Sequence, residues 1–594
     1  MTIEISPSRD SLLTAFGKET LADRYLLPDE TPQQLFKRVA EAYQENEEHG
    51  KRIYDYMSKH WFMPATPVLS NGGTERGLPI SCFLNEVSDS LHSIDATQSE
   101  NLWLASKGGG IGTYWGNLRS IGERVGAVGK TSGIMPFIKI QDSQTLGISQ
   151  GSLRRGSAAA YIPIHHPEIN EFIHMRKPTG GDPDRKCLNM HHGVVVDDKF
   201  MEAVVAGEDY DLLSPHTGET IKTINARELW HEILTMRMET GEPYILWIDT
   251  VNKAIAPHMS KQDMLCSTSN LCVEITLHTS DTRTAVCCLS SLNIETFHEW
   301  EDQFDQVVYD VLMFLDNVLQ SFIDTAPDTH SKAVYSAIQE RSVGLGTMGF
   351  HGYLMSQNMV FGSPESHEFN RSFYAAFQEH VDTANYRLAL EKGPCPDWLA
   401  VNPDWETQGF EETSPPVRFT NATAIAPTAS ISIICGGATA GTDLLPANIY
   451  THKTLSGSFT VKNKYLEKVL QRHGKNEQEV WSQILQDGGS VLNLSFLTPH
   501  ERDVFKTAFE IDQMQVVKMA GGRARHIHQS QSLNVFINPD ANKGYVNLLH
   551  LTAWRLGIKS MYYCRSRAIR RAENIGGKVE RHIIQEQDDC EACQ

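Results

Sequence analysis

The sequence predicts an α/β fold in which a buried, largely parallel sheet follows a helical N-terminal region. Two patterns support this prediction. From about residue 78 onward, short apolar runs alternate with longer amphipathic stretches, which is typical of strands connected by helices. Before that point, apolar residues recur at helical spacing, and the pattern stops at two neighbouring prolines, Pro64 and Pro67. A barrel is one form that such a sheet can take, and the α/β part is longer than eight strand–helix units need, so we expect further strands or insertions.

Individual elements are placed by their apolar spacing and by their end signals. Within residues 10–63, Thr31 and Pro32 open a helix with a capping side chain and a proline in the first turn. Strands are expected at the short apolar runs, which are Ile80–Leu84, Gly193–Val196, Tyr244–Trp247 and Ala424–Ala426. Long helices are expected at the amphipathic stretches, which are Glu228–Glu239, Phe304–Ile323, Phe369–Leu390 and Leu548–Arg571.

Composition excludes several classes of protein. The net charge of -20 opposes general binding to nucleic acid polymers, which needs a basic surface. The longest low-charge run, Ala422–Gly441, is broken by Pro427 and is too polar to span a membrane, and the N-terminus lacks an apolar signal core. Eleven cysteines without a secretory signal indicate free or catalytic thiols in a reducing cytoplasm.

One stretch, Ser269–Ile275, places a thiol between an amide and a carboxylate. In an extended segment successive side chains face opposite sides. The apolar side chains of this stretch would then point one way, and Asn270, Cys272 and Glu274 would point the other. An acid, an amide and a thiol on one face form a site-like arrangement, and we expect the chemistry of the chain to centre there.

Two cysteines near the C-terminus, Cys590 and Cys593, form a C-x-x-C pair in a charged segment with few apolar residues. Zinc would need two further ligands at close spacing, and only His582 is nearby. A redox dithiol, which can exchange with a disulfide elsewhere, fits better. For a lone internal cysteine such as Cys82, composition alone predicts only a small buried hydrophobe.

Two segments have the composition of an anion site, although a plain turn explains each equally well. Lys107–Gly112 is rich in glycine, and Ala426–Ser430 supplies hydroxyls where a helix could begin. The two E-x-x-H matches, at 171–174 and 295–298, lack the partner ligands of a metal centre. We therefore expect no metal site in this chain.

Two adjacent tyrosines, Tyr562 and Tyr563, fall in the last predicted helix. Aromatic residues in such a helix usually belong to the core. The alternative is a relay for an electron, which needs oxidisable side chains in sequence and a thiol that receives the hole.

These motifs together, in this order, resemble the large (α) subunit of class I ribonucleotide reductase. The resemblance runs from about Leu21 to the C-terminus. It rests on ATPVLSNGG at 65–73, SC at 81–82, SQGSLRRGSA at 149–158, SNLCVEI at 269–275, CCLSSLN at 287–293, APTASIS at 426–432, MYYCRSR at 561–567 and CEAC at 590–593. It implies a ten-stranded α/β barrel over residues 78–571, a helical N-terminal region over 1–77 and a redox tail over 572–594. A finger loop inside the barrel would carry the radical cysteine.

The resemblance also implies roles for single residues. Cys272 would be the thiyl radical that abstracts the 3′ hydrogen of a ribonucleoside diphosphate. Glu274 would take the 3′-OH proton, and Asn270 would hydrogen-bond the same region. Cys82 and Cys287 would supply two electrons while the 2′-OH leaves as water. The ribose and phosphates would be held by Thr66, Ser81, Pro427, Thr428, Ala429 and Ser430.

Partners follow from the same resemblance. Tyr562 and Tyr563 would pass the radical inward from a separate, metal-containing β subunit. Cys590 and Cys593 would re-reduce the internal pair and would be reduced in turn by thioredoxin or glutaredoxin. The active complex would contain a homodimer of this chain.

Regulation would use dNTP or ATP as specificity effectors, bound near Asp89, Arg119 and Arg155. Only about twenty residues precede the shared start at Leu21, whereas an ATP-cone needs about a hundred, so the resemblance implies a short form without that domain.

Two other functions remain open at this point. A class II, adenosylcobalamin-dependent enzyme would share the barrel and the cysteines, and the adjacent Tyr562 and Tyr563 favour class I over it. A non-catalytic nucleotide-binding regulator would have no use for five thiols in this order.

Overall fold

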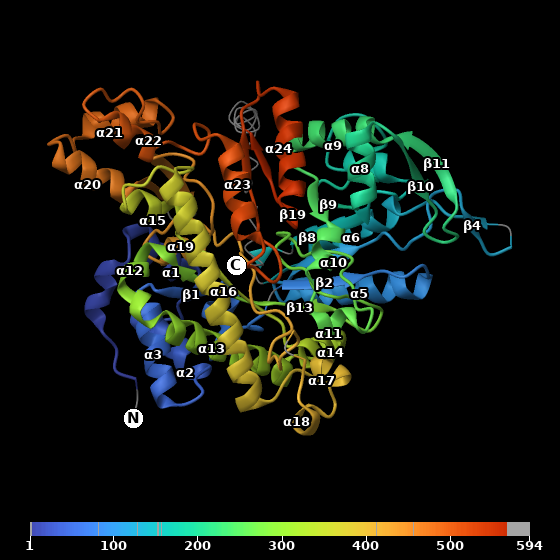
Figure 1. Ribbon diagram of the computed structural model, residues 1–594, viewed down its shortest axis with the longest axis horizontal. Helices are drawn as coiled ribbons and strands as arrows, with labels where there is room; N and C mark the ends of the chain where they lie inside the picture. Colours follow the sequence, from blue (N-terminus) through green and yellow to red (C-terminus); the bar gives the residue numbers. More distant parts are fainter. Residues whose placement is uncertain are drawn as a thin grey trace.

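A computed structural model describes residues 3–80, 82–127, 129–150, 154–155, 157–411, 413–454 and 457–566. Figure 1 shows the N-terminal helices, in blue, at one end of the molecule, with the strands of the large sheet, in blue to green, to their right. Helices of the middle and C-terminal parts of the chain cover both regions. The smaller helices α20 (Lys464–Arg472), α21 (Gln478–Gln486) and α22 (Pro499–Val504) lie together at the upper left.

The N-terminal region forms capped helices, as the sequence predicts. Thr14, Thr31 and Asn46 each accept a backbone N–H at a helix start, and Thr31 makes a reciprocal capping box with Gln34. These helices are α1 (Ala15–Arg24), α2 (Pro32–Ala42) and α3 (Glu47–Ser58). The prolines do not simply end the region: Pro64 closes the short strand β1 (Phe62–Pro64), and Pro67 lies in the first turn of α4 (Thr66–Asn71).

The largest sheet has seven strands, and its interior is parallel. Its order is β13-β2-β3-β8-β9-β12-β19. Neighbours from β2 to β12 run parallel, whereas the edge strands β13 and β19 pair antiparallel. The bounds are Ala285–Val286 (β13), Cys82–Glu86 (β2), Gly110–Tyr114 (β3), Ser157–Pro163 (β8), His191–Val196 (β9), Tyr244–Trp247 (β12) and Ser560–Met561 (β19). Three of the predicted strands fall here, and their continuous burial is typical of a parallel sheet covered on both faces.

A second set of strands faces the first. β1 pairs with β14 (Cys288–Asn293), and β14 runs parallel to β15 (Val343–Met348). The predicted strand at 424–426 is wrong as a regular strand: Thr423 bridges to Leu345 on one side, and Ile425 bridges to Gln531 on the other. The segment therefore links two neighbours by single bridges. β18 (Val535–Ile537) and β20 (Cys564–Ser566) form a further parallel pair.

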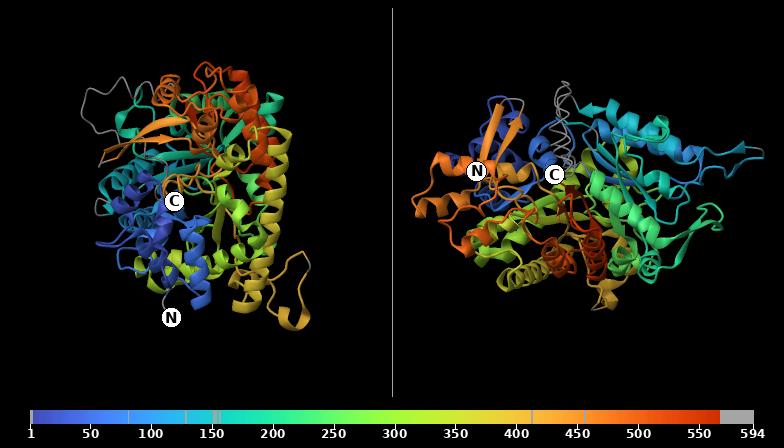
Figure 2. Two further views of the ribbon diagram at one scale, coloured as in Figure 1. Left: turned by 90° about the vertical axis from the view of Figure 1, so that its left-hand side faces the viewer. Right: turned by 90° about the horizontal axis from the view of Figure 1, so that it is seen from above.

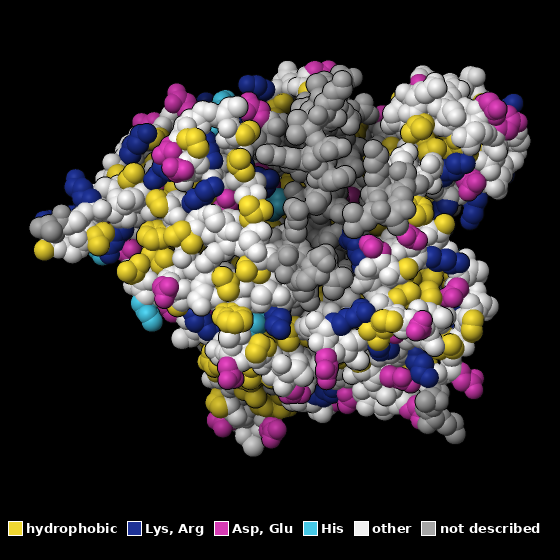
Figure 3. Space-filling model, turned by 180° about the vertical axis from the view of Figure 1, so that it is seen from behind, with side chains coloured by type: hydrophobic (Ala, Val, Ile, Leu, Met, Phe, Trp, Pro, Cys, Tyr) yellow, Lys and Arg dark blue, Asp and Glu magenta, His cyan; other side chains and the backbone are white. Residues whose placement is uncertain are grey.

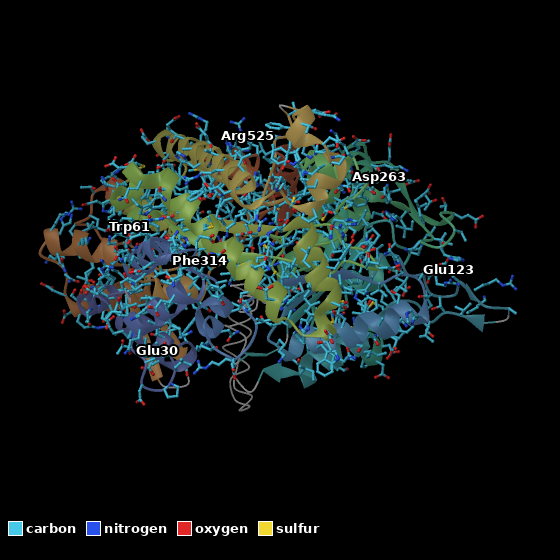
Figure 4. The ribbon with its side chains drawn as sticks, turned by 90° about the horizontal axis from the view of Figure 1, so that it is seen from below. Glu30, Trp61, Glu123, Asp263, Phe314 and Arg525 are labelled. Carbon is cyan, nitrogen blue, oxygen red and sulfur yellow. The ribbon has the colours of Figure 1, made fainter. Side chains whose placement is uncertain are left out.

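Helices cover these strands, and three long ones agree with the sequence prediction. They are α9 (Ala226–Thr240), α13 (Phe304–Thr325) and α16 (Pro364–Lys392). Phe314 of α13 packs against Tyr43 and Phe62, so this helix joins the N-terminal region to the second set of strands (Figure 4). Other covering helices are α5 (Leu91–Ser106), α6 (Met135–Gly147), α8 (Asp198–Ala206), α14 (Ser331–Glu340) and α23 (Gln513–Ala524). The two views of Figure 2 show the same arrangement from the side and from above.

The last predicted helix is too long. α24 spans only Lys543–Arg555, and the chain then continues through β19 and β20. Gly557 has a φ of 72°, and Ile558 N–H donates to the Ala553 carbonyl, which is a common way to end a helix. Gly557 was therefore a usable stop signal, and Tyr562 and Tyr563 do not lie on a helix.

On the described part of the face in Figure 3, lysine and arginine side chains alternate with acidic ones. Among the described residues, no helix combines the length and apolar content needed to cross a bilayer.

One close backbone approach fixes how the segment containing Cys272 lies against the sheet. A Cβ added at Gly112 of β3 would overlap the carbonyl oxygen of Ser269. Tyr161 of β8 donates its hydroxyl to the Asn270 carbonyl over 2.5 Å. Packing therefore requires a glycine at position 112. This glycine of the segment 107–112 is explained without an anion site.

Replacing Gly112 with alanine should therefore destabilise the protein. The added methyl group meets a backbone atom that cannot rotate away, and we expect a loss of about 1–3 kcal/mol in the free energy of unfolding. Gly147→Ala is the control, because Gly147 ends α6 with open space around it and should be neutral or slightly stabilising. Denaturant unfolding of both variants measures the difference, and equal stability would contradict the close approach.

Candidate active site

The segment 269–275 is a turn, and the prediction of an extended segment is wrong. Leu271 and Cys272 form the turn, and Val273 has a φ of 60°, in the left-handed region. The Asn270 side chain closes it, because its Oδ1 accepts the Ile275 N–H over 3.2 Å. Alternation therefore does not explain which side chains share a face. Cys272 and Glu274 are nevertheless buried together, each with no exposed surface.

Two serines from the C-terminal third of the chain hold this turn through hydrogen bonds to its backbone carbonyls. Ser532 donates its hydroxyl to the Cys272 carbonyl over 2.7 Å, and Ser560 donates to the Val273 carbonyl over 2.8 Å. Ser532 also donates to Glu274 Oε2 over 3.2 Å. A left-handed valine costs about 1–2 kcal/mol. These hydrogen bonds, together with the contacts to β3 and β8, offset that cost and fix the position of the Cys272 thiol.

Two further cysteines lie opposite each other beside this turn. Ala285 pairs with Leu84 and Val286 pairs with Phe83, so the same register places Cys287 opposite Cys82. The Cys287 N–H donates to the Cys82 carbonyl over 3.3 Å, in agreement with that register. Directly opposed residues project to the same face of a sheet, so the two thiols are neighbours. Neither thiol is part of a disulfide in the structure.

Amide side chains point at both thiols. Asn270 Nδ2 lies 3.0 Å from Cys82 Sγ, and Gln529 Nε2 lies 3.7 Å from Cys287 Sγ. Burial raises the pKa of the Cys287 thiol well above its ordinary value, so it carries its proton at neutral pH. Cys288 is the next residue and begins β14, so its side chain faces the opposite way. Of the two adjacent cysteines, Cys287 is the one that this register places opposite Cys82.

The two tyrosines connect this site to the outside. The Tyr562 hydroxyl lies 3.3 Å from Cys272 Sγ, and the Tyr562 and Tyr563 ring centroids are 4.2 Å apart. Tyr562 is fully buried and Tyr563 is partly exposed. Tyr244 of β12 packs against both rings, at 4.8 and 5.2 Å. Three oxidisable rings in contact thus lead from the edge of the site to the thiol.

The residues expected to hold substrate are placed in two segments. Thr66 is the first residue of α4, and its hydroxyl lies 2.8 Å from that of Tyr25. Thr428 has a φ of 55°, and its hydroxyl accepts the Gly441 N–H over 2.6 Å. Pro427, Ala429 and Ser430 flank it, directly before the short helix α19 (Ile431–Ile434). Ser81 lies outside the described residues, as do Cys590 and Cys593.

The expected effector residues form an ion pair. Arg119 Nη2 lies 2.8 Å from Asp89 Oδ2, and the Arg119 backbone N–H also donates to Asp89. His216 adds a contact of 3.3 Å to the same carboxylate. Arg155 lies in the two-residue strand β7 (Arg154–Arg155), opposite Ser149, and its side chain is outside the described part.

Residues of the two E-x-x-H matches form ion pairs with side chains elsewhere in the chain. Glu171 binds Arg185, His174 binds Glu232, and Glu295 binds Lys464. Within the residues that the structure describes, no cluster of three or more histidines, cysteines or acids is placed to hold a metal ion.

Sequence reasoning missed several residues of the site. Tyr244, Gln529 and Ser532 touch its central groups, but each stands in a stretch without a distinguishing motif. Lys559 was also missed: its Nζ donates to the carbonyls of residues 527, 528 and 529, each over 2.7 Å, and burial lowers its pKa to about 7. Lys559 thus fixes the backbone that carries Gln529. The signal in the sequence that could have pointed to Lys559 was its charge between the uncharged residues Ile558 and Ser560.

Comparisons with known proteins agree with this geometry. Residues 80–564 match the family model for the barrel domain of ribonucleotide reductase, and residues 11–77 match the model for its all-alpha domain. The chain belongs to the ribonucleotide reductase family, among its large subunits.

Individual relatives match over nearly the whole chain. The ribonucleoside-diphosphate reductase large subunit of Invertebrate iridescent virus 3 is 38% identical over 651 residues. The alignment covers 100% of this chain and 100% of that relative. A putative large subunit from Frog virus 3 is 38% identical, with 94% of this chain and 95% of the relative covered. The solved class Id alpha subunit of Actinobacillus ureae superposes with a TM-score of 0.82 at 32% identity, covering 93% of this chain and 97% of that one.

Mild oxidation should join Cys82 to Cys287. Opposed residues of an antiparallel pair have Cα atoms about 4.5–5.5 Å apart, which is within the range of a disulfide. We expect peptide mapping after diamide treatment to find this link as the main internal product, and Cys82→Ser to lose it. A main product that joins Cys272 or Cys288 instead would contradict the register.

Proposed function

We propose that this chain is the catalytic subunit of a class I ribonucleoside-diphosphate reductase, which reduces ribonucleoside diphosphates to 2′-deoxyribonucleoside diphosphates. The observation that carries the proposal is the contact of 3.3 Å between the Tyr562 hydroxyl and Cys272 Sγ, with the tilted ring of Tyr563 packed against Tyr562. This arrangement can bring an oxidising equivalent to a buried thiol. The opposed Cys82 and Cys287 can supply two electrons next to it.

The reaction assigns a separate task to each group. Cys272, as a thiyl radical, takes the 3′ hydrogen of the substrate, and Glu274 takes the 3′-OH proton while Asn270 hydrogen-bonds the same region. The 2′-OH leaves as water, and Cys82 and Cys287 give up two electrons and become a disulfide. The raised pKa of Cys287 suits this task, because a protonated thiol delivers a hydrogen together with its electron. Burial of Cys272 keeps water and stray reductants away from the radical.

Substrate and effector sites complete the proposal. Thr66, Ser81 and residues 427–430 hold the ribose and phosphates. The Asp89–Arg119 pair and Arg155 belong to the site for dNTP or ATP effectors, and this pair would open to accept a nucleotide.

Partners and organisation are proposed as well. A small (β) subunit with its own metal centre supplies the oxidising equivalent to Tyr563. Cys590 and Cys593, in a tail over 572–594, reduce the internal pair and are reduced by thioredoxin or glutaredoxin. Residues 78–571 form a ten-stranded barrel behind a helical region at 1–77, and two copies form a homodimer. A reducing cytoplasm suits the chain, because none of the nine cysteines that the structure describes is part of a disulfide.

The runner-up is a class II enzyme, which generates its radical from adenosylcobalamin. Such an enzyme would need no relay of tyrosines between the surface and Cys272. The contact between the Tyr562 and Tyr563 rings favours class I. An assay of the purified chain with CDP and a small dithiol separates the two: the proposal expects turnover with a small subunit and none with adenosylcobalamin alone.

Cys272→Ser should abolish turnover. A serine hydroxyl cannot be oxidised to the radical that removes the 3′ hydrogen, so we expect deoxynucleotide formation to fall by about 10³-fold or more while nucleotide binding persists. Cys187→Ser is the control, since Cys187 is buried away from the tyrosines and hydrogen-bonds to Met175 through its backbone. Substantial turnover by Cys272→Ser would remove the thiyl assignment.

Changing both Cys590 and Cys593 to serine should distinguish the redox role of the tail from catalysis in the barrel. Turnover with thioredoxin should stop, because the internal disulfide is buried and needs a mobile dithiol to reach it. Turnover with a small dithiol that enters the site should remain. If the double variant loses activity with both reductants, the tail is not a redox relay.

A further inference from the structure

A glutamine amide lies against the sulfur of Cys287. Gln529 Nε2 is 3.7 Å from Cys287 Sγ, and both residues are buried. The sulfur packs against β15, where a Cβ added at Gly344 would come within 2.9 Å of it. The amide reaches the same strand, because Nε2 also lies 3.0 Å from the Val343 carbonyl oxygen. The sulfur and the amide therefore meet over the start of β15.

The amide presents an N–H group, and not its oxygen, to the sulfur. Gln529 Oε1 accepts the Thr276 backbone N–H over 3.3 Å. Nε2 has two N–H groups, of which one serves the Val343 carbonyl and the other serves Cys287. A reversed amide would set its oxygen against the Val343 carbonyl oxygen and its NH₂ group against the Thr276 N–H. The surrounding backbone therefore fixes the orientation of the amide.

We propose that Gln529 donates this N–H to the Cys287 sulfur while that sulfur carries negative charge, and thereby assists the thiol–disulfide exchange that reopens the Cys82–Cys287 disulfide. The inference deepens the proposed function and rests on it, since each turnover leaves this disulfide to be reduced. Gln529 is a catalytic residue of the exchange, because it touches a reacting atom.

The exchange balances in electrons and protons. A thiolate of the incoming dithiol attacks one sulfur of the disulfide, the S–S bond breaks, and the other sulfur leaves as a thiolate. The second thiolate of the reductant then attacks its own partner sulfur in the mixed disulfide, and the remaining cysteine leaves as a thiolate. The dithiol loses two electrons and becomes a disulfide, and its two protons go to the two released thiolates. Cys287 thus leaves as an anion once in every cycle, whichever sulfur is attacked first.

A neutral donor suits this step. Burial raises the pKa of the Cys287 thiol, and Cys288 and Glu274 raise it further, whereas the hydrogen bond from Gln529 acts in the opposite direction. A thiol of lower pKa is the better leaving group. Because the amide carries no charge, Cys287 remains a protonated thiol in the resting protein. The donor takes effect when the sulfur becomes an anion.

Cys82 has a corresponding donor on the other side of the pair. Asn270 Nδ2 lies 3.0 Å from Cys82 Sγ, and Asn270 Oδ1 accepts the Ile275 backbone N–H. Each sulfur of the pair thus has an amide donor whose orientation a backbone N–H fixes. The two thiolates that one exchange cycle releases can therefore each receive a hydrogen bond.

The exchange can be measured on the full-length chain without substrate or small subunit. Diamide forms the disulfide, excess dithiothreitol at about pH 8 reopens it, and alkylation at timed intervals with peptide mapping follows both cysteines. Gln529→Met keeps the length of the side chain but has no N–H group. We expect the release of Cys287 to slow by about tenfold or more, because a hydrogen bond to a charged group is lost.

The same time course shows when Cys287 leaves. If Cys287 leaves in the first exchange, the internal disulfide itself persists in Gln529→Met. If it leaves in the second, a dithiothreitol adduct on Cys287 accumulates. Either result supports the proposal. Release of Cys287 within threefold of the wild type, with no more adduct than the wild type shows, would overturn it.

Gln531→Met is the matched control. Gln531 is also buried, its Oε1 accepts from Arg523 Nε over 2.7 Å, and its Nε2 lies 3.1 Å from the Ala520 carbonyl oxygen. Its replacement removes similar hydrogen bonds without removing a donor to Cys287, so the release of Cys287 should stay within twofold of the wild type. Equal slowing by Gln531→Met would overturn the proposal, because loss of packing would then explain the effect.

A second variant keeps the test valid if Gln529→Met fails to fold. Gln529→Glu retains the shape of the side chain and an oxygen that can accept the Thr276 N–H. Its ionised carboxylate has no N–H to give and repels a thiolate, so the release of Cys287 should again slow by about tenfold or more. Release at the wild-type rate by this variant would also contradict the role of Gln529.

Failure of the proposed function looks different. If the wild-type chain with its small subunit does not reduce CDP, the proposed function is wrong, and the exchange measurement still reports on the amide and the sulfur. If the wild type turns over and both Gln529 variants release Cys287 as the wild type does, only the inference about Gln529 is wrong.

Discussion

The structure depends on how the turn at 269–275 is held by the large sheet and by the segment that contains Ser532. Its backbone touches Gly112 and Tyr161 on the large sheet, and it accepts hydrogen bonds from Ser560 of β19 in the same sheet and from Ser532. These contacts come from segments far apart in the sequence, and Ser560 alone lies 287 residues from Val273. The Cys272 thiol has a defined position only once all of them have met, so the site is a property of the complete fold.

Burial produces two opposite chemical characters in neighbouring thiols. Cys287 keeps its proton because no charge within the site compensates for burial, which suits a hydrogen and electron donor. Cys272 is buried as deeply, but a phenol hydroxyl touches its sulfur. Under the proposed function, the same low-dielectric interior holds a reductant and the thiol that is to be oxidised, and the difference between them comes from the side chain that each one meets.

The sequence predicted the main helices and the parallel strands well, because their apolar spacing and end signals are local. It misjudged the segment at 269–275 because a left-handed Val273 leaves no trace in residue type, and tertiary hydrogen bonds impose it. It extended the last helix past Gly557, although that glycine was a readable stop. Pairing of Cys82 with Cys287 could be expected from motif resemblance, whereas their register needed the structure. Tyr244 and Gln529 could not be found, because their contacts with Tyr562 and Cys287 exist only in the folded chain.

The most direct test of the account is a variant that lacks the Tyr562 hydroxyl group. Tyr562→Phe keeps the ring and its contact with the Tyr563 ring but deletes the hydroxyl that lies 3.3 Å from Cys272 Sγ. Turnover of CDP by the complex with the small subunit should fall to background while nucleotide binding and thermal stability stay close to those of the wild type. Turnover near the wild-type rate would contradict the central claim that Cys272 is oxidised through this pair of tyrosines.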